Sequence, residues 1–172
     1  MGIMGITAAG ESPQRPESEM PGIATTPPTR VVGDLVAAAV GAIECYSNGL
    51  RIAVTVWTRE PGVAQQLFQA LARRGAGGGG RVGFRFGNGA TVWHPRSTPV
   101  VAQPGKPAPS PEIEGGRASE TRLDLQFWLT PLPATDLVCV VDLPDLGLAN
   151  AQLVISGDPL LGGSRRAQPL WS

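Results

Sequence analysis

The clearest alternation of hydrophobic and polar positions lies between residues 50 and 59. Every second residue from Leu50 to Val56 is apolar, which is the period of a strand with one buried face. The preceding stretch, residues 31–46, is apolar at both odd and even positions, as expected for a strand with little solvent contact. Asn48-Gly49 separates the two stretches and readily takes positive φ, a strong signal for a tight turn. The segment Val31 to Arg59 is therefore predicted to be a β-hairpin.

A helical period replaces the alternation after Pro61. Apolar residues recur at helical spacing from Val63 to Leu71, and Gly75 closes the pattern, so one short helix is predicted here. Residues 82–86 then alternate again and are followed by Asn88-Gly89 and a short returning segment. These features predict a second hairpin.

Three further segments read as strands: residues 123–129, 137–143 and 151–156. The total is about seven short strands separated by turn signals, with no regular alternation of strands and helices. We therefore predict an all-β fold, an immunoglobulin-like antiparallel β-sandwich of about seven strands with one short helix.

Two Pro-rich segments lack hydrophobic periodicity. Residues 1–29 are predicted to be a disordered N-terminal tail, within which Met20 is an alternative start. Residues 94–120 are predicted to be a disordered loop. The remaining chain, residues 30–172, is predicted to be a single β-sandwich domain. The overall content of 23 Gly and 17 Pro fits a protein with long irregular segments.

The charge balance excludes some classes of partner. The chain has fourteen basic and fourteen acidic residues and a formal net charge of zero. No long-range field therefore attracts nucleic acid or an anionic membrane. The first residues lack the pattern of a secretory signal, and no apolar run is long enough to span a bilayer. We expect a soluble, cytoplasmic protein that binds neither nucleic acid nor membrane.

The two cysteines, Cys45 and Cys139, lie in apolar, strand-like runs far apart in the sequence. Neither has the close Cys spacing of a zinc site. We predict buried free thiols, with a disulfide between them as the alternative.

The sequence offers no convincing catalytic, cofactor or metal site. The run Gly75–Gly80 contains G-x-G-x-x-G, but it follows a predicted helix and precedes a strand, which is the wrong context for nucleotide binding. His94 is the only histidine, so a His-based triad or a multi-histidine metal site within one chain is excluded. The remaining paired carboxylates are interpreted as solvated loop or turn residues: Glu112 and Glu114, Asp142 and Asp145. We predict a protein that is not an enzyme and has no cofactor.

Two tryptophans fall on the polar faces of their strands. Trp57 shares parity with Arg59, and Trp128 alternates with buried positions of its own strand. Trp and Arg are enriched in interface hot spots, so Trp57, Arg59 and Trp128 form the candidate partner surface. The competing interpretation is that the predicted helix or the C-terminal tail covers both indoles.

These residues support two hypotheses of function. The leading one is a protein-interaction or self-association module that uses an exposed sheet face or an edge strand, with another protein or a second copy as partner. The alternative is a small-ligand or carbohydrate-binding module that stacks its ligand on Trp57 and Trp128.

Four phrases of the sequence also carry a resemblance to a known family: residues 84–89, 127–133, 138–148 and 169–171. Together they resemble an uncharacterised family of small β-sandwich proteins from GC-rich bacteria, over about residues 30–172. In that family an acid and a Trp precede the proline, where this chain has Asp142-Leu143-Pro144. The resemblance implies the domain boundaries, and it implies no activity, cofactor or catalytic residue.

Overall fold

The computed structural model describes residues 14–72, 79–87, 89–95 and 110–171. The described residues form twelve strands, two α-helices and one 3-10 turn. In chain order these are β1 (Glu19–Met20), β2 (Gly22–Ala24), β3 (Thr29–Val32), β4 (Val36–Cys45), β5 (Leu50–Thr58), α1 (Val63–Ala72), β6 (Arg81–Phe86), β7 (Val92–His94), β8 (Ser110–Ala118), β9 (Arg122–Thr130), β10 (Leu137–Leu143), η1 (Pro144–Leu146), β11 (Leu148–Ile155), α2 (Gly157–Arg165) and β12 (Gln168–Pro169).

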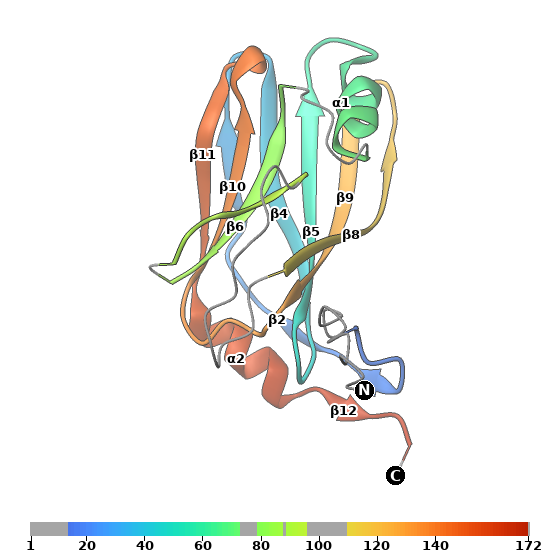
Figure 1. Ribbon diagram of the computed structural model, residues 1–172, viewed down its shortest axis with the longest axis vertical. Helices are drawn as coiled ribbons and strands as arrows, with labels where there is room; N and C mark the ends of the chain where they lie inside the picture. Colours follow the sequence, from blue (N-terminus) through green and yellow to red (C-terminus); the bar gives the residue numbers. More distant parts are fainter. Residues whose placement is uncertain (1–13, 73–78, 88, 96–109, 172) are drawn as a thin grey trace, which may run out of the picture.

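The strands build two main antiparallel sheets that face each other as layers (Figure 1). One sheet has six strands in the order β2-β4-β5-β9-β8, with β3 also paired to β4, and the other has four in the order β11-β10-β6-β7. A small third sheet joins β1 to β12. The all-β sandwich is confirmed, with more strands than the expected seven and a second helix. Its immunoglobulin-like character stays a prediction.

The core lies between the two main sheets and follows the predicted alternation. The inward side chains of β5 and β9 are all at most 1% exposed, from Leu50 to Val56 and from Leu123 to Leu129. They meet residues of the four-stranded sheet, where Phe84 contacts Phe127 edge to face with ring centroids 5.2 Å apart. Burial of these aliphatic and aromatic side chains is the main force that holds the layers together.

Two helices lie near opposite ends of the sandwich (Figure 1). The predicted helix is confirmed as α1, and its Leu71 is buried in the core. Helix α2 was not predicted, because its sequence holds three glycines and a proline, which are poor helix formers. Tertiary packing stabilises it instead: Leu160 is fully buried, and the absence of a side chain at Gly163 lets α2 approach Cys45 closely.

The predicted hairpins are confirmed with one change. Strands β4 and β5 pair across the Asn48-Gly49 turn, although neither of these two residues has the positive φ that the sequence predicted, and β6 pairs with β7. Asn88 of the second turn lies outside the described residues. The stretch 31–46 is not one strand, because Gly33 donates its N–H to the Val36 carbonyl and turns the chain between β3 and β4.

The prediction of a disordered tail over residues 1–29 is wrong for its second half. Strand β2 pairs with β4, and β1 pairs with β12 near the C-terminus. These segments add backbone hydrogen bonds to existing edges, which needs no hydrophobic period of their own. Residues 1–13 lie outside the described part.

The predicted loop at 94–120 also contains structure. His94 ends β7, and residues 110–118 form β8, which pairs with β9 along its whole length. Pro111 and the two glycines of β8 are tolerated because β8 is an edge strand. Residues 96–109 lie outside the described part.

Candidate functional site

The candidate surface is the side of the six-stranded sheet that points away from the core, here called the outer face. The strand registers place its side chains in rows that cross the sheet. One end row, the Trp57 end, contains Val32, Ala37, Trp57 and Arg122. The opposite end row, the Trp128 end, contains Ile23, Glu44, Arg51, Trp128 and Glu112.

Trp57 is an accessible aromatic on this face. Trp57 is 40% exposed, and Val32, in the same row, is 64% exposed. The guanidinium carbon of Arg122 lies 5.6 Å from the centre of the indole ring, within range for a cation–π contact. The Trp57 end therefore presents a flat apolar surface, one side of which contacts the guanidinium of Arg122.

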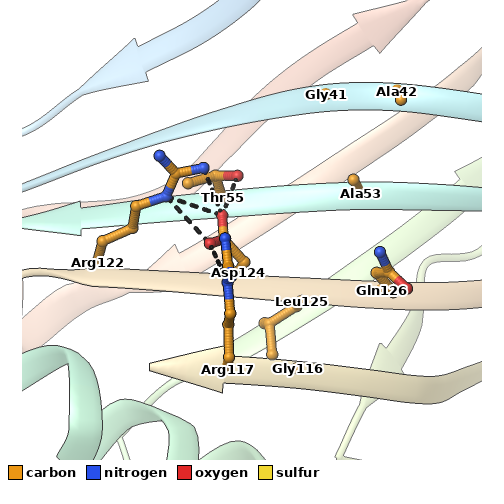
Figure 2. Close-up of a pocket in the computed structure, with 10 residues that line it drawn as sticks. All are labelled: Gly41, Ala42, Ala53, Thr55, Gly116, Arg117, Arg122, Asp124, Leu125 and Gln126. Atoms are coloured by element: carbon orange, nitrogen blue, oxygen red, sulfur yellow. Dashed lines mark hydrogen bonds and ion pairs between the residues drawn. The ribbon is translucent and has the colours of Figure 1, made fainter. Parts of the chain in front are cut away.

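An ordered charge cluster lies in the next row. Asp124 accepts a hydrogen bond from the Thr55 hydroxyl at 2.9 Å and from Arg122 Nη2 at 2.9 Å, and it pairs with Arg117 Nε at 3.4 Å. Figure 2 shows both arginines and Thr55 converging on this carboxylate. Partial desolvation raises the pKa of Asp124, but the hydrogen bonds from Arg122, Thr55 and Arg117 outweigh it, so the pKa lies below its ordinary value. The aspartate is ionised and holds both arginines in place.

The middle of the outer face has a floor of small residues. Gly41 and Ala42 from the bulge in β4 and Ala53 from β5 leave an open hollow of about 560 Å³, which the Asp124 cluster borders (Figure 2). The bulge adds a residue without a bulky side chain, so the backbone itself is close to the surface. This small-residue floor separates the two end rows.

Trp128 is buried, and its assignment to the partner surface is wrong. It is 2% exposed, against 40% for Trp57. Tyr46 packs against it edge to face at 5.5 Å, and the Gly49 turn lies directly against its indole. The predicted covers, α1 and the C-terminal tail, are not the cause: α1 packs on the inner side of the sheet, and Trp171 is itself 79% exposed.

Charged side chains are gathered around Trp128. Arg51 pairs with Glu114 at 2.9 Å and with Glu44 at 3.3 Å, and it also bonds to Gln126. Arg15, from the N-terminal segment, reaches Glu114 at 3.4 Å. Glu112 and Glu114 thus lie on strand β8 rather than in a loop, which corrects the sequence interpretation; both are exposed, and Glu114 is ion-paired.

Arg59, the third predicted residue, lies one position beyond the end of β5. It is exposed, and its backbone N–H donates to the Leu35 carbonyl at 2.9 Å. Sequence parity placed Arg59 beside Trp57, while the residues that organise this end are Arg122, Asp124 and Arg117. Arg122 and Asp124 were visible in the sequence as polar residues that alternate with the buried residues of β9. Arg117 could not be placed, because β8 and its pairing with β9 were not predicted.

Of the other residues considered for chemistry, His94 and Asp142 have structural partners, whereas Asp145 is exposed in η1, as expected for a turn carboxylate. His94 Nε2 lies 3.0 Å from the Leu71 carbonyl of α1, and its ring packs on Phe127. Asp142, expected in a solvated turn, is 8% exposed on β10, where it accepts from Arg81 Nε and from the Asn150 N–H. Within the described residues, no group of three or more His, Cys, Asp or Glu is arranged to hold a metal ion.

The prediction of buried cysteines is confirmed. Both thiols are free and 0% exposed. Burial raises the pKa of Cys45 to about 11 and that of Cys139 to about 12, so neither is a thiolate nucleophile near neutral pH.

In the described part of the chain, neither helix has the length and apolar character needed to cross a membrane. The resemblance drawn from four sequence phrases stays a prediction. Comparisons of the chain with protein-family models, with curated proteins and with solved structures gave no significant match.

Proposed function

We propose that the chain is a non-enzymatic protein-interaction module that binds its partner through the outer face of the six-stranded sheet. The observation that carries this proposal is the exposed indole of Trp57, which lies on the same face as the hollow lined by Gly41, Ala42 and Ala53. Aromatic side chains flanked by arginine are common energetic centres of interfaces. The Asp124 cluster keeps Arg122 and Arg117 ordered, so their side chains lose less entropy on binding.

The geometry favours the sheet face over an edge strand as the binding element. The edge strand β8 begins Ser110-Pro111 and is bulged between Ile113 and Gly115. Bulges and prolines are the usual means by which proteins prevent strand addition at an edge. Strand β11, at the edge of the other sheet, lies against β3. Among the described residues, the hollow in the middle of the outer face and the Trp57 end of that face are open to solvent.

A module that stacks a ligand on both tryptophans is not part of the proposal, because Trp128 is 2% exposed. The proposal places the module in the cytoplasm. Two buried thiols that remain free are consistent with a reducing compartment.

Site-specific photocrosslinking tests the proposed binding face. A photoreactive amino acid replaces Ala53 on the outer face or, as a matched control, Gln152 on the opposite sheet. In cells that express the chain, we expect discrete protein adducts from position 53 that are strongly reduced when Trp57→Ala is added, and none from position 152. Absence of position-dependent adducts contradicts the proposal.

A further inference from the structure

We propose that the partner is a second copy of this chain, packed outer face to outer face about a twofold axis. This inference rests on the proposed function, because it uses the same surface. The axis lies within the interface, crosses the strands at right angles and passes above the small-residue floor. Such an interface is isologous, so each contact occurs twice.

The charges of the outer face support self-complementarity. Around the Trp57 end and the adjacent row, three arginines accompany one aspartate: Arg30, Arg117, Arg122 and Asp124. Around the Trp128 end, three glutamates accompany two arginines: Glu44, Glu112, Glu114, Arg15 and Arg51. One face thus has an arginine-rich end and a glutamate-rich end, although the whole chain has zero net charge.

The proposed axis places the opposite ends of two copies against each other. Each strand then lies over the same strand of the second copy, running in the opposite direction. Arg117, which is 84% exposed in its side chain, comes to the region of Glu112 and Glu114 of the second copy. Opposite charges that meet across an interface favour this register. The alternative register, in which like ends of the two copies meet, would set arginines against arginines.

The same rotation matches exposed apolar residues. Val32 at one end, 64% exposed, comes over Ile23 of the second copy, 52% exposed. Trp57 comes over Arg51 of the second copy, whose intrachain partners Glu44 and Glu114 already fix it. Both pairings follow from the strand registers, because β3 and β2 lie on the same side of β4.

The size of the face is compatible with a weak dimer. Five strand positions, one of them shared by β2 and β3, about 30 Å long at about 4.8 Å spacing give roughly 700 Å² per copy, somewhat less than the ~800 Å² per partner of a standard interface. The Gly and Ala floor removes bulk where the two sheets approach most closely. Packed sheets keep their strand directions within about 30°, which preserves the pairing of ends.

Sedimentation equilibrium of the purified full chain tests this inference. We expect a monomer–dimer equilibrium, and Trp57→Ala, which removes the indole without adding a charge opposite Arg51, is expected to weaken it by roughly tenfold or more. Val154→Ala is the matched control, since Val154 is 53% exposed on the opposite sheet. Its dimerisation should equal that of the unmodified chain.

A charge-exchange experiment tests the register itself. Arg117→Glu alone and Glu112→Arg alone each create like-charge contacts in their own homodimer, so each should dimerise more weakly than the unmodified chain. Mixed in equal amounts, the two variants should form a heterodimer more readily than either homodimer, because both contacts become attractive again. Failure of the mixture to recover dimerisation overturns the proposed register.

The outcomes separate this inference from the proposed function. A chain that stays monomeric at high concentration, while position 53 still gives adducts of another mass, overturns the second-copy inference and leaves the binding face intact. A monomeric chain without position-dependent adducts overturns both. A dimer that Val154→Ala disrupts and Trp57→Ala does not disrupt also overturns the inference.

Discussion

Trp57 and Trp128 occupy equivalent positions in the sequence pattern but opposite environments in the structure. Both lie on the polar parity of a central strand, and both point to the outer face. Trp57 is 40% exposed, whereas Trp128 is 2% exposed. The difference arises at the β4–β5 turn, where Tyr46 and Gly49 fold over the indole of Trp128. The odd or even position of a residue along its strand therefore predicts the face on which its side chain lies. Whether solvent reaches that side chain depends on the neighbouring turn.

The two ends also differ in how their charges are used. At the Trp57 end, arginines converge on one ionised aspartate and leave the indole free on one side. At the Trp128 end, Arg51 is shared among Glu44, Glu114 and Gln126 beside a buried ring. The Trp57 end leaves its aromatic ring accessible to a partner, whereas the Trp128 end buries its ring within the monomer and offers a partner only Ile23 and the charged side chains around the ring.

The largest expected effect is a difference in folding stability between variants at the two tryptophans. Trp128→Ala should lower the free energy of unfolding by about 3–5 kcal/mol, the usual range for removing a large buried aromatic side chain. Trp57→Ala should cost about 1 kcal/mol or less, because surface positions rarely contribute more. Urea unfolding at low protein concentration measures both. Equal losses for the two variants contradict the distinction between the ends.

A smaller effect is expected at the turn that covers Trp128. A Cβ added at Gly49 would lie 2.7 Å from Cζ2 of Trp128 and 2.5 Å from the Leu129 carbonyl oxygen. Gly49→Ala should therefore cost about 1–3 kcal/mol, as overpacked sites usually do. Gly115→Ala is the matched control, since nothing lies within 4 Å of its added Cβ. An unchanged stability in Gly49→Ala would show that the turn does not pack tightly on Trp128.

The smallest effect concerns the pH dependence of the Trp57 end. The pKa of Asp124 is lower in the folded chain than its ordinary value, so its ionised form stabilises the fold. That contribution is present above the unfolded pKa of about 3.9 and is lost as the pH falls through the lower folded value. Because the cluster is partly solvated, we expect about 1 kcal/mol or less.

Urea unfolding at about pH 6 and about pH 3, on either side of the unfolded pKa, measures this contribution. Asp124→Asn should be less stable than the unmodified chain at the higher pH, and this difference should shrink at the lower one. A stability difference that is the same at both pH values contradicts the assignment.

The sequence pattern predicted those features that depend on local periodicity. The alternation in β5, the Asn48-Gly49 turn and the helical spacing of α1 are each confirmed. Strands β2 and β8 were not predicted because few of their residues are large and apolar; backbone pairing with a neighbour holds them in place, with core contacts only at Ala24, Ile113 and Ala118. Helix α2 was not predicted because its sequence is a poor helix former. Close packing of Gly163 on Cys45 offsets this weakness.

The candidate site was predicted in part. Trp57 follows from parity alone, and its exposure agrees with the interpretation. Trp128 was assigned wrongly, because covering by Tyr46 depends on the geometry of the turn rather than on spacing in the sequence. The role of Arg117 required the register of β8 on β9, which a Pro- and Gly-rich segment does not reveal.

Fluorine NMR of the chain labelled with 5-fluorotryptophan tests the central claim most directly. The four tryptophan signals, assigned by single Trp→Phe variants, are recorded with a soluble gadolinium chelate that broadens solvent-exposed nuclei. In dilute protein we predict strong broadening of the Trp57 signal and a sharp Trp128 signal, and at high protein concentration we predict that Trp57 becomes protected. Equal broadening of Trp57 and Trp128, or broadening of Trp57 that does not change with concentration, contradicts the account.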